Sequence, residues 1–312
     1  MPANGHQLSH ILSSYYAPRG RARIFETGIM ISQTYLNPAD NLIGIIGDPG
    51  SGKSALAKGM FPGLELTNDD DGVNVRPLPL LGVDENNGFF SPHTYHVDIR
   101  FETGFTQLSV LADAIVEAIR RDKRVVCEHF ELVYPMLPMN ADLLIGIGEE
   151  ILVARPTIFG PEPQQIYDTV HKSLPYRLMA HTAEDLCEHF LNPDDDNRCL
   201  HGDVRHGFTL IFQDYPPELN IHELEAHVND VIAQDLPVTY YDDNHITIGE
   251  TIHHCTGPRT HVGRTGQIEN FHLLDHLVYD HLRNRYILVG CVGEGAEANL
   301  QKLDTIRLHE TF

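Results

Sequence analysis

The stretch "NLIGIIGDPGSGKSALAKGMF", residues 41–61, decides the fold of the first half of the chain. Residues 42–46 form a short apolar run, which is typical of a buried strand. A glycine-rich loop, "GDPGSGKS" at 47–54, follows, and helix-forming residues come after it. A strand, a loop of this pattern and a helix in that order predict a phosphate-binding loop. The alternative is an ordinary glycine-rich turn, which the flanking strand and helix disfavour.

The residue types in this loop suit a nucleoside triphosphate. Glycines let the backbone N–H groups approach the phosphate oxygens. We expect Lys53 to reach the terminal phosphates and Ser54 to bind Mg²⁺ at the start of the helix. ATP and Mg²⁺ are therefore the expected ligands, and the predicted nucleotide-binding residues are Gly47, Asp48, Gly50, Ser51, Gly52, Lys53 and Ser54.

Helical and strand patterns alternate after the loop. A buried strand is expected to end at Glu128, and residues 149–156 predict another strand. Apolar residues recur along one face of a helix before them, at Leu108, Leu111, Ala112, Ile115 and Ile119. Such alternation predicts a three-layer α/β domain with a parallel sheet and its ligand at the carboxyl ends of the strands.

Phosphate-bound Mg²⁺ also needs carboxylates, which commonly stand at strand ends. Asp98 in "YHVDIR" and Glu128 are the predicted catalytic residues, and Asp98 is also a predicted magnesium ligand. The acidic run "NDDDG" at 68–72 offers further carboxylates, but such a run is more often a solvated loop.

The order "GDPGSGKS", "SPHTYHVDIR", "RVVCEHFE" resembles the small ATPase that assists threonylcarbamoyl-adenosine modification of tRNA. That family combines a Walker loop, an SPT-type switch, an HxDxYR segment and a strand ending in an acidic residue. The resemblance covers about residues 40–135 and implies metal-binding or catalytic roles for Ser54, Asp98 and Glu128. Here "SPH" lies almost directly against "TYHVD", unlike the family's spacing, and a generic P-loop kinase fits the same residues.

Composition limits the class of protein. The 312 residues suffice for two domains, and no apolar run approaches the ~20 residues that span a bilayer. The amino terminus lacks the pattern of a secretory signal, so we expect a cytoplasmic protein. The five scattered cysteines indicate reduced thiols. The net charge of −22 disfavours polyanionic partners unless local basic patches contact them.

Prolines at 156, 161 and 163 indicate a linker between two halves. The expected layout is an N-terminal helical extension at 1–38, a P-loop nucleotide-binding domain at 39–160 and a second domain at 172–312.

The second half carries metal-binding residue types on a helix and on a later loop. His181, Asp185 and His189 recur every four residues in "YRLMAHTAEDLCEHFL", so they project from one helical face. The loop "HHCTGPRTHVGRTG" at 253–266 follows much later. Two donors from each segment would suit four-coordinate Zn²⁺, and the predicted ligands are His181, Asp185, Cys255 and His261. The alternative is a histidine-rich surface with a buried cysteine, because the chain has 20 histidines.

Three ordered segments, "PYRLMAHTAEDL", "HELEAHVNDVIAQDLPVTYYDD" and "HHCTGPRTHVGRTGQIENF", resemble the editing domain of alanyl-tRNA synthetase and its free-standing relatives. The resemblance covers roughly residues 174–292 and implies an α+β domain of the threonyl/alanyl-tRNA synthetase editing type. The family has an HTAxH helix and a C-x₃-H loop. Here Asp185 replaces the second helix histidine. The loop is C-x₅-H, which makes His253 or His254 conceivable substitutes for His261.

In that family, metal and loop groups bind the aminoacyl end of a mischarged tRNA, and water cleaves the ester. Arg264, Thr265 and Gly266 are the predicted substrate-binding residues, since donors are needed for the developing oxyanion. Their alternative role is a tight glycine turn with surface arginines.

Few basic residues are available for a tRNA. Arg19, Arg21 and Arg23 form one cluster, which could instead contact nucleotide. The cluster at 120–124 ends a helix, where cations complement the macrodipole. We expect nucleotide-dependent hydrolysis of an aminoacyl-tRNA or related aminoacyl ester. The alternative is a P-loop small-molecule kinase or ATPase whose second domain only binds an amino acid or a protein partner.

Overall fold

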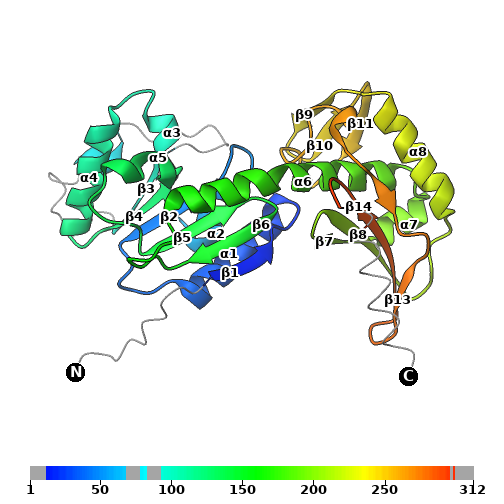
Figure 1. The fold of residues 1–312 in the computed structure, drawn as a ribbon, viewed down its shortest axis with the longest axis horizontal. Coiled ribbons are helices and arrows are strands. Elements are labelled where there is room, and N and C mark those ends of the chain that lie inside the picture. The colour runs from blue at the N-terminus through cyan, green and yellow to red at the C-terminus, as the bar shows by residue number, and fades with distance from the viewer. Residues whose placement is uncertain (1–11, 68–77, 83–92, 296–297, 299–312) are drawn as a thin grey trace. The chain divides into compact units, whose positions relative to one another are not determined.

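A computed structural model describes residues 12–67, 78–82, 93–295 and 298 of the chain (Figure 1). These residues divide into two compact units. The first holds the described residues up to Ala17, together with Arg21–Lys172. The second holds Pro18–Gly20 and the described residues from Ser173 onward. Among all of them, no helix has both the length and the apolar character that crossing a membrane requires.

The first unit is built on a six-stranded mixed sheet with the order β1-β6-β5-β2-β4-β3. Neighbours among β3, β4, β2 and β5 run parallel, whereas β6 is antiparallel to both β5 and β1. The strands are β1 (Leu12–Tyr16), β2 (Leu42–Ile46), β3 (Thr94–Asp98), β4 (Arg124–Glu128), β5 (Leu143–Ile147) and β6 (Glu150–Ala154).

The predicted parallel sheet is therefore correct for the strands β3, β4, β2 and β5 and wrong for β6. Only Gly148 and Glu149 separate β5 from β6, and the Gly148 N–H donates to the Glu150 carbonyl at 3.0 Å. So short a connection makes a hairpin, because a parallel crossover needs about a dozen residues or more. β1 extends the same antiparallel edge, so the described residues before 39 supply a strand as well as a helix.

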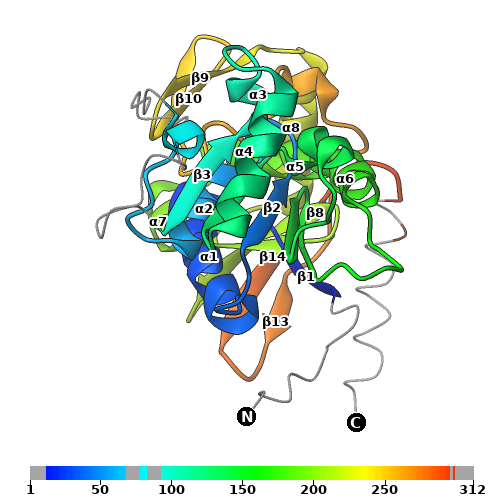
Figure 2. The same cartoon turned by 90° about the vertical axis from the view of Figure 1, so that its left-hand side faces the viewer.

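Helices cover both faces of this sheet and give three layers (Figure 2). One face is covered by α1 (Arg21–Tyr35) and α2 (Lys53–Met60). The other face is covered by α4 (Leu108–Arg120), α5 (Phe130–Val133) and the first part of α6 (Pro163–His189). The short elements of this unit are η1 (Pro79–Gly82), α3 (Ile99–Glu102) and η2 (Tyr134–Met136).

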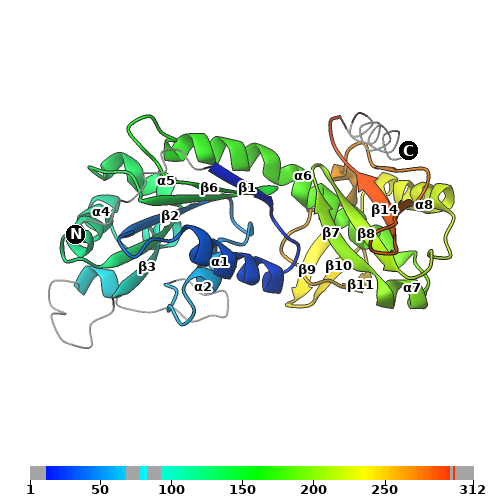
Figure 3. The ribbon, with the colours of Figure 1, turned by 90° about the horizontal axis from the view of Figure 1, so that it is seen from below.

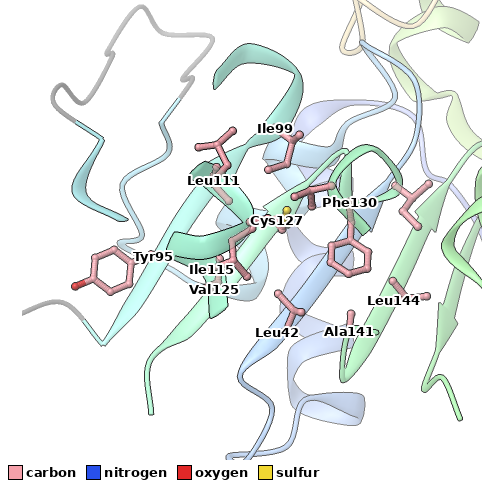
Figure 4. Packing of buried hydrophobic residues seen from close by; sticks show 14 of the residues in the cluster. Leu42, Tyr95, Ile99, Leu111, Ile115, Val125, Cys127, Phe130, Ala141 and Leu144 are labelled. Carbon is pink, nitrogen blue, oxygen red and sulfur yellow. The ribbon is translucent and has the colours of Figure 1, made fainter. Parts of the chain in front are cut away.

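Side chains of β2 alternate between the two faces. Leu42 packs with the α4 side, and Ile43 packs with the α1 side. Gly44 lies between Phe130 and Leu144, and a Cβ there would come within 2.7 Å of both side chains. Figure 4 shows Phe130 between Leu42 and Leu144 in this cluster. The glycine in "LIGII" therefore lets α5 pack closely on the strand that leads into the loop.

The second unit contains two antiparallel sheets with helices packed on them (Figure 3). One sheet has the order β11-β10-β9, and the other has the order β12-β14-β8-β7 with β13 paired to β14. The strands are β7 (Leu200–Val204), β8 (Gly207–Gln213), β9 (Val238–Asp242), β10 (His245–Ile248), β11 (Thr251–His254), β12 (His272–Leu273), β13 (Val278–Asp280) and β14 (Arg285–Cys291).

The last part of α6 and α8 (Ile221–Ala233) bury apolar residues against these strands. The remaining elements are α7 (Pro193–Arg198) and η3 (Thr265–Gln267). The boundary between the units, at Lys172 and Ser173, falls inside α6. The predicted proline linker therefore ends where α6 begins, at Pro163, and the chain enters the second unit as a helix.

Candidate functional site

The loop at 47–54 joins the carboxyl end of β2 to α2, as its sequence predicts. Gly52 precedes α2 in the left-handed conformation, with φ 101°, which strongly favours glycine. A Cβ at Gly47 would lie 2.7 Å from the Ile147 carbonyl oxygen. Both glycines therefore serve the backbone path that exposes N–H groups at the start of a helix, where anions bind.

Lys53, the first residue of α2, is buried, and its Nζ donates to the Asp48 carbonyl at 2.9 Å. Burial lowers the pKa of Lys53, although the negative charges of Glu128 and Asp98 oppose the shift. The ammonium is thus poorly solvated and close to acidic groups. A bound polyphosphate would add the negative charge that stabilises its protonated form.

Glu128 stands at the end of β4 and links Ser54 to His96. Ser54 Oγ donates to Glu128 Oε2 at 3.3 Å, and His96 Nε2 lies 3.1 Å from Glu128 Oε1. The Thr67 N–H donates to His96 Nδ1 at 3.1 Å, so Nε2 carries the ring proton and donates to Glu128. Burial alone would raise the pKa of Glu128, but His96 and Lys53 outweigh it and lower the pKa. Glu128 is therefore an oriented carboxylate beside Ser54.

Asp98 pairs in register with Glu128, so both carboxylates stand at the same edge of the sheet. Asp98 Oδ1 accepts the Phe101 N–H at 3.0 Å as the N-cap of α3. The structure thus places Asp98 and Glu128 at the carboxyl ends of β3 and β4, and Lys53 and Ser54 at the start of α2, which follows the neighbouring strand β2. The acidic run at 68–72 and residues 91–92 of the "SPH" segment lie outside the described residues.

Three partners of the first site are absent from the predicted residues, namely His96, Tyr167 and His171. His96 shares a strand face with Asp98, and their spacing of two could have identified it. Asp48 contacts α6, with Tyr167 Oη donating to Oδ1 at 3.3 Å and His171 Nδ1 lying 2.6 Å from Oδ2. No local pattern predicts those contacts, because 119 and 123 residues separate the partners.

In the second unit, Asp185, Cys255 and His261 bring their ligand atoms within 4.8 Å of one another. His261 Nε2 lies 3.1 Å from Cys255 Sγ and 3.4 Å from Asp185 Oδ2. All three side chains are buried, with 2–4% of their surface exposed. The predicted helix and loop therefore do meet, despite the altered C-x₅-H spacing.

The Thr182 hydroxyl decides which nitrogen of His261 carries the proton. It donates to the Leu178 carbonyl at 2.9 Å, as residues of a helix often do four positions back. Its oxygen accepts the Val262 N–H at 3.2 Å and lies 3.3 Å from His261 Nδ1. Since the hydroxyl proton is already used, His261 Nδ1 must donate.

Burial and the charge of Arg19 lower the pKa of His261 well below its usual range, so the ring is neutral. With the proton on Nδ1, Nε2 presents a lone pair to Cys255 and Asp185. The Gly257 N–H donates to Cys255 Sγ at 3.2 Å from the other side. A nitrogen lone pair, a sulfur and a carboxylate oxygen converge, which is favourable when a proton or cation lies between them. These residues fit Zn²⁺, whose histidine ligands commonly donate their second N–H to a neighbouring group.

His181 belongs to the predicted ligands but lies outside the group of three. It is buried, its Nε2 is 3.6 Å from Asp203 Oδ1, and its Nδ1 has no hydrogen-bond partner among the described residues. Burial lowers the pKa of His181 to about 4, so it also is neutral. The structure thus places His181 beside the group as a neutral imidazole held by Asp203.

A buried ionic cluster adjoins the group formed by Asp185, Cys255 and His261. Arg19 forms ion pairs with Glu184 at 2.6 Å, with Glu188 at 3.3 Å and with Asp185. His201 lies 2.9 Å from Glu184 and 3.1 Å from Glu188, and these carboxylates raise its pKa to about 9. Arg19, the first arginine of the basic cluster considered for tRNA or nucleotide, is 2% exposed, and its guanidinium is used in these ion pairs.

The predicted substrate-binding residues hold a turn against the end of α8. The Thr265 hydroxyl is fully buried, donates to the Val231 carbonyl at 2.9 Å and accepts from the Leu236 N–H at 2.8 Å. Arg264 pairs with Asp235 at 2.8 Å, and a Cβ at Gly266 would lie 2.6 Å from the same carboxylate. These contacts are structural and do not point to a substrate.

Other predicted basic and histidine residues also have structural contacts. Arg121 pairs with Glu117 at 2.7 Å, and Arg124 donates to the Asp40 carbonyl at 2.7 Å. The His253 ring packs edge-on against His189, with ring centroids 4.6 Å apart. His253 and His254 are not among the described residues grouped with Asp185.

No model of a known protein family matches the sequence, and a comparison with curated proteins finds no match either.

Proposed function

We propose that the chain binds a nucleoside triphosphate with Mg²⁺ in its first unit and Zn²⁺ in its second unit. The second unit is proposed to hydrolyse an aminoacyl ester, such as the end of an aminoacyl-tRNA, in a nucleotide-dependent manner. The observation that carries the metal site is the neutral His261 ring, whose Nε2 lone pair faces Cys255 Sγ and Asp185 Oδ2 at 3.1 and 3.4 Å.

Each residue of the second site has a defined task in this proposal. Asp185, Cys255 and His261 hold the ion, and the Thr182 hydroxyl keeps the His261 lone pair directed at it. Bound zinc supplies a Lewis acid for the ester carbonyl. Asp203, whose side chain is 18% exposed, stands 3.6 Å from His181 Nε2 and can accept a proton at Oδ1.

In the first unit, the loop N–H groups and Lys53 bind phosphate oxygens, and Ser54 holds Mg²⁺. Ser54 Oγ donates its proton to Glu128 Oε2, which leaves the lone pairs of the hydroxyl oxygen to hold Mg²⁺, and the Glu128 carboxylate can orient a water or accept its proton. His96 keeps Glu128 ionised and fixed in place.

A second function is favoured by the burial of the ligands. Catalytic zinc needs an open position for water, but Asp185 and Cys255 are 4% and 2% exposed. If the zinc is only structural, the chain would instead be a P-loop kinase or ATPase whose second unit binds an amino acid or a protein partner. The ordered editing-type segments support hydrolysis, whereas the net charge of −22 supports this alternative.

Deacylation of tRNA charged with alanine, serine or glycine distinguishes the two functions, measured with and without ATP–Mg²⁺. The hydrolytic function predicts that the amino acid is released faster than the uncatalysed rate and that Cys255→Ser abolishes this release. Cys291→Ser is the matched control, because Cys291 is buried in a separate cluster with Leu274 and Val289. Zinc-loaded protein that deacylates none of these substrates would favour the binding function.

A further inference from the structure

The tripeptide Pro18–Gly20 lies in the second unit, although residues on both sides of it along the chain belong to the first. Arg177 donates to the Pro18 carbonyl at 3.1 Å. Gly20 has φ 82°, and a Cβ there would lie 3.0 Å from Thr256 Oγ1. The tripeptide is therefore held against the loop that follows Cys255, and it has a fixed path there.

Arg19, the middle residue of this tripeptide, directs its two terminal nitrogens at different groups. One nitrogen pairs with Glu184 at 2.6 Å and with Glu188 at 3.3 Å. The other pairs with Asp185 Oδ1 and lies 3.8 Å from Cys255 Sγ. A planar guanidinium can bridge such groups, whereas a lysine ammonium is a single point charge.

The two oxygens of Asp185 consequently have different partners. Oδ1 pairs with Arg19, whereas Oδ2 faces His261 Nε2 at 3.4 Å. Cys255 Sγ likewise accepts from the Gly257 N–H at 3.2 Å and from Arg19 at 3.8 Å. Asp185 and Cys255 are thus each held on one side by Arg19 and each face His261 Nε2 on the other.

The geometry points to Arg19 as the positioning residue of the zinc site, and this inference rests on the metal site proposed above. Its guanidinium fixes the Asp185 carboxylate in a one-oxygen binding mode and orients the Cys255 sulfur. Glu184 and Glu188 hold the guanidinium, and His201 in turn pairs with both carboxylates. A segment that precedes the phosphate-binding loop thereby completes a site whose ligands all lie beyond residue 180.

Titration of the full chain with Co²⁺ tests this role, because cobalt reports both affinity and ligand geometry through its visible and sulfur-to-metal absorption. Arg19→Gln should lower the Co²⁺ affinity about 10- to 100-fold, as the loss of partners behind metal ligands does, and should change the spectrum per bound ion. Arg19→Lys should give an intermediate affinity. The control Arg21→Gln, an exposed position with the same charge change, should match the wild type.

A variant that is only less stable would keep the wild-type spectrum per bound ion, so that result in Arg19→Gln would overturn the role of Arg19. If Arg19→Gln does not fold, a wild-type affinity and spectrum in folded Arg19→Lys would overturn it equally. Wild-type protein that binds neither Co²⁺ nor Zn²⁺ would refute the metal site itself, and the inference with it.

Discussion

Among single residues, Thr182 has a contact that the helix motif alone does not predict. The sequence places Thr182 beside His181, but only the tertiary structure brings its hydroxyl to His261, 79 residues away. Because the hydroxyl proton is donated to Leu178, the oxygen accepts from His261 Nδ1 and leaves Nε2 for a metal. Thr182 therefore acts through His261.

We predict that Thr182→Val lowers zinc affinity about 10- to 100-fold, since it removes the acceptor that fixes the His261 ring. Thr182→Ser keeps the hydroxyl and should stay close to the wild type. Competition with a chromophoric chelator measures both. Equal affinities in the valine and serine variants would show that this hydroxyl does not orient His261.

His201 gives a prediction about pH in metal-free protein. Hydrogen bonds to Glu184 and Glu188 raise the pKa of His201 from 6.5 to about 9 in the folded state. The folded chain therefore binds a proton that the unfolded chain releases between these values. The resulting stabilisation is complete below pH 6.5 and is lost as the pH rises toward 9.

His201→Gln should flatten the fall in melting temperature over that range, whereas the exposed His222→Gln should not change it. Thermal melts recorded with a chelator across the range provide the measurement. An unchanged slope in His201→Gln would contradict a charged His201 in the folded state.

The residues of the first site were predictable from sequence, whereas the contacts of Arg19 were not. A strand, a glycine loop and a helix contiguous in sequence predicted Lys53 and Ser54, and the strand-end position predicted Glu128. Arg19 contacts Cys255 across 236 residues, and no periodicity carries that information. Thr265 matched a family motif, but its hydroxyl is hydrogen-bonded to the backbone of Val231 and Leu236.

Among the helices and strands, α1 packs closely on α2, the helix that follows the loop at 47–52. A Cβ at Gly59 would overlap the Phe25 carbonyl oxygen, and one at Gly28 would overlap the Leu56 carbonyl oxygen. Each helix has a glycine at this contact, Gly28 in α1 and Gly59 in α2, so the two backbones lie close together. Moving the helices apart would expose Ile24 and Met60 to solvent.

Gly59→Ala should therefore destabilise the first unit by about 1–3 kcal/mol, as overpacking does, despite the higher helix propensity of alanine. Gly104→Ala is the control, because its nearest atom, the Phe101 carbonyl oxygen, lies 3.3 Å from the added Cβ. Denaturant unfolding of the first unit, followed by circular dichroism, compares the two. Equal stability of Gly59→Ala and the wild type would mean that α1 and α2 can separate at little cost.

Strand order was harder to predict than strand position. The pattern at 149–156 correctly predicted a strand, but its direction depends on the tight turn at Gly148 and Glu149. Residues between elements decide direction, whereas the residues within an element decide only its type. The same limit applies to α6, whose helical pattern runs through Pro175 and across the boundary of the units.

For the whole chain, the two proposed ligands occupy different units, so their affinities should respond to different substitutions. Lys53→Ala should weaken binding of ATP–Mg²⁺, measured by calorimetry, because the variant lacks the positive charge that would face the terminal phosphates. The zinc content should be unchanged. His181→Ala/Cys255→Ala should abolish zinc binding and leave ATP affinity unchanged. Loss of both ligands in either variant, while circular dichroism shows that the variant is folded, would refute the separation of the sites.

X-ray absorption at the zinc edge, on the full chain loaded with one equivalent of zinc, tests the metal centre most directly. We predict one sulfur at about 2.3 Å, with the remaining ligands nitrogen or oxygen at about 2.0–2.2 Å. Cys255→Ser should lose the sulfur while the protein stays folded. A wild-type spectrum without sulfur, or a sulfur that persists in Cys255→Ser, would contradict a centre built from Asp185, Cys255 and His261.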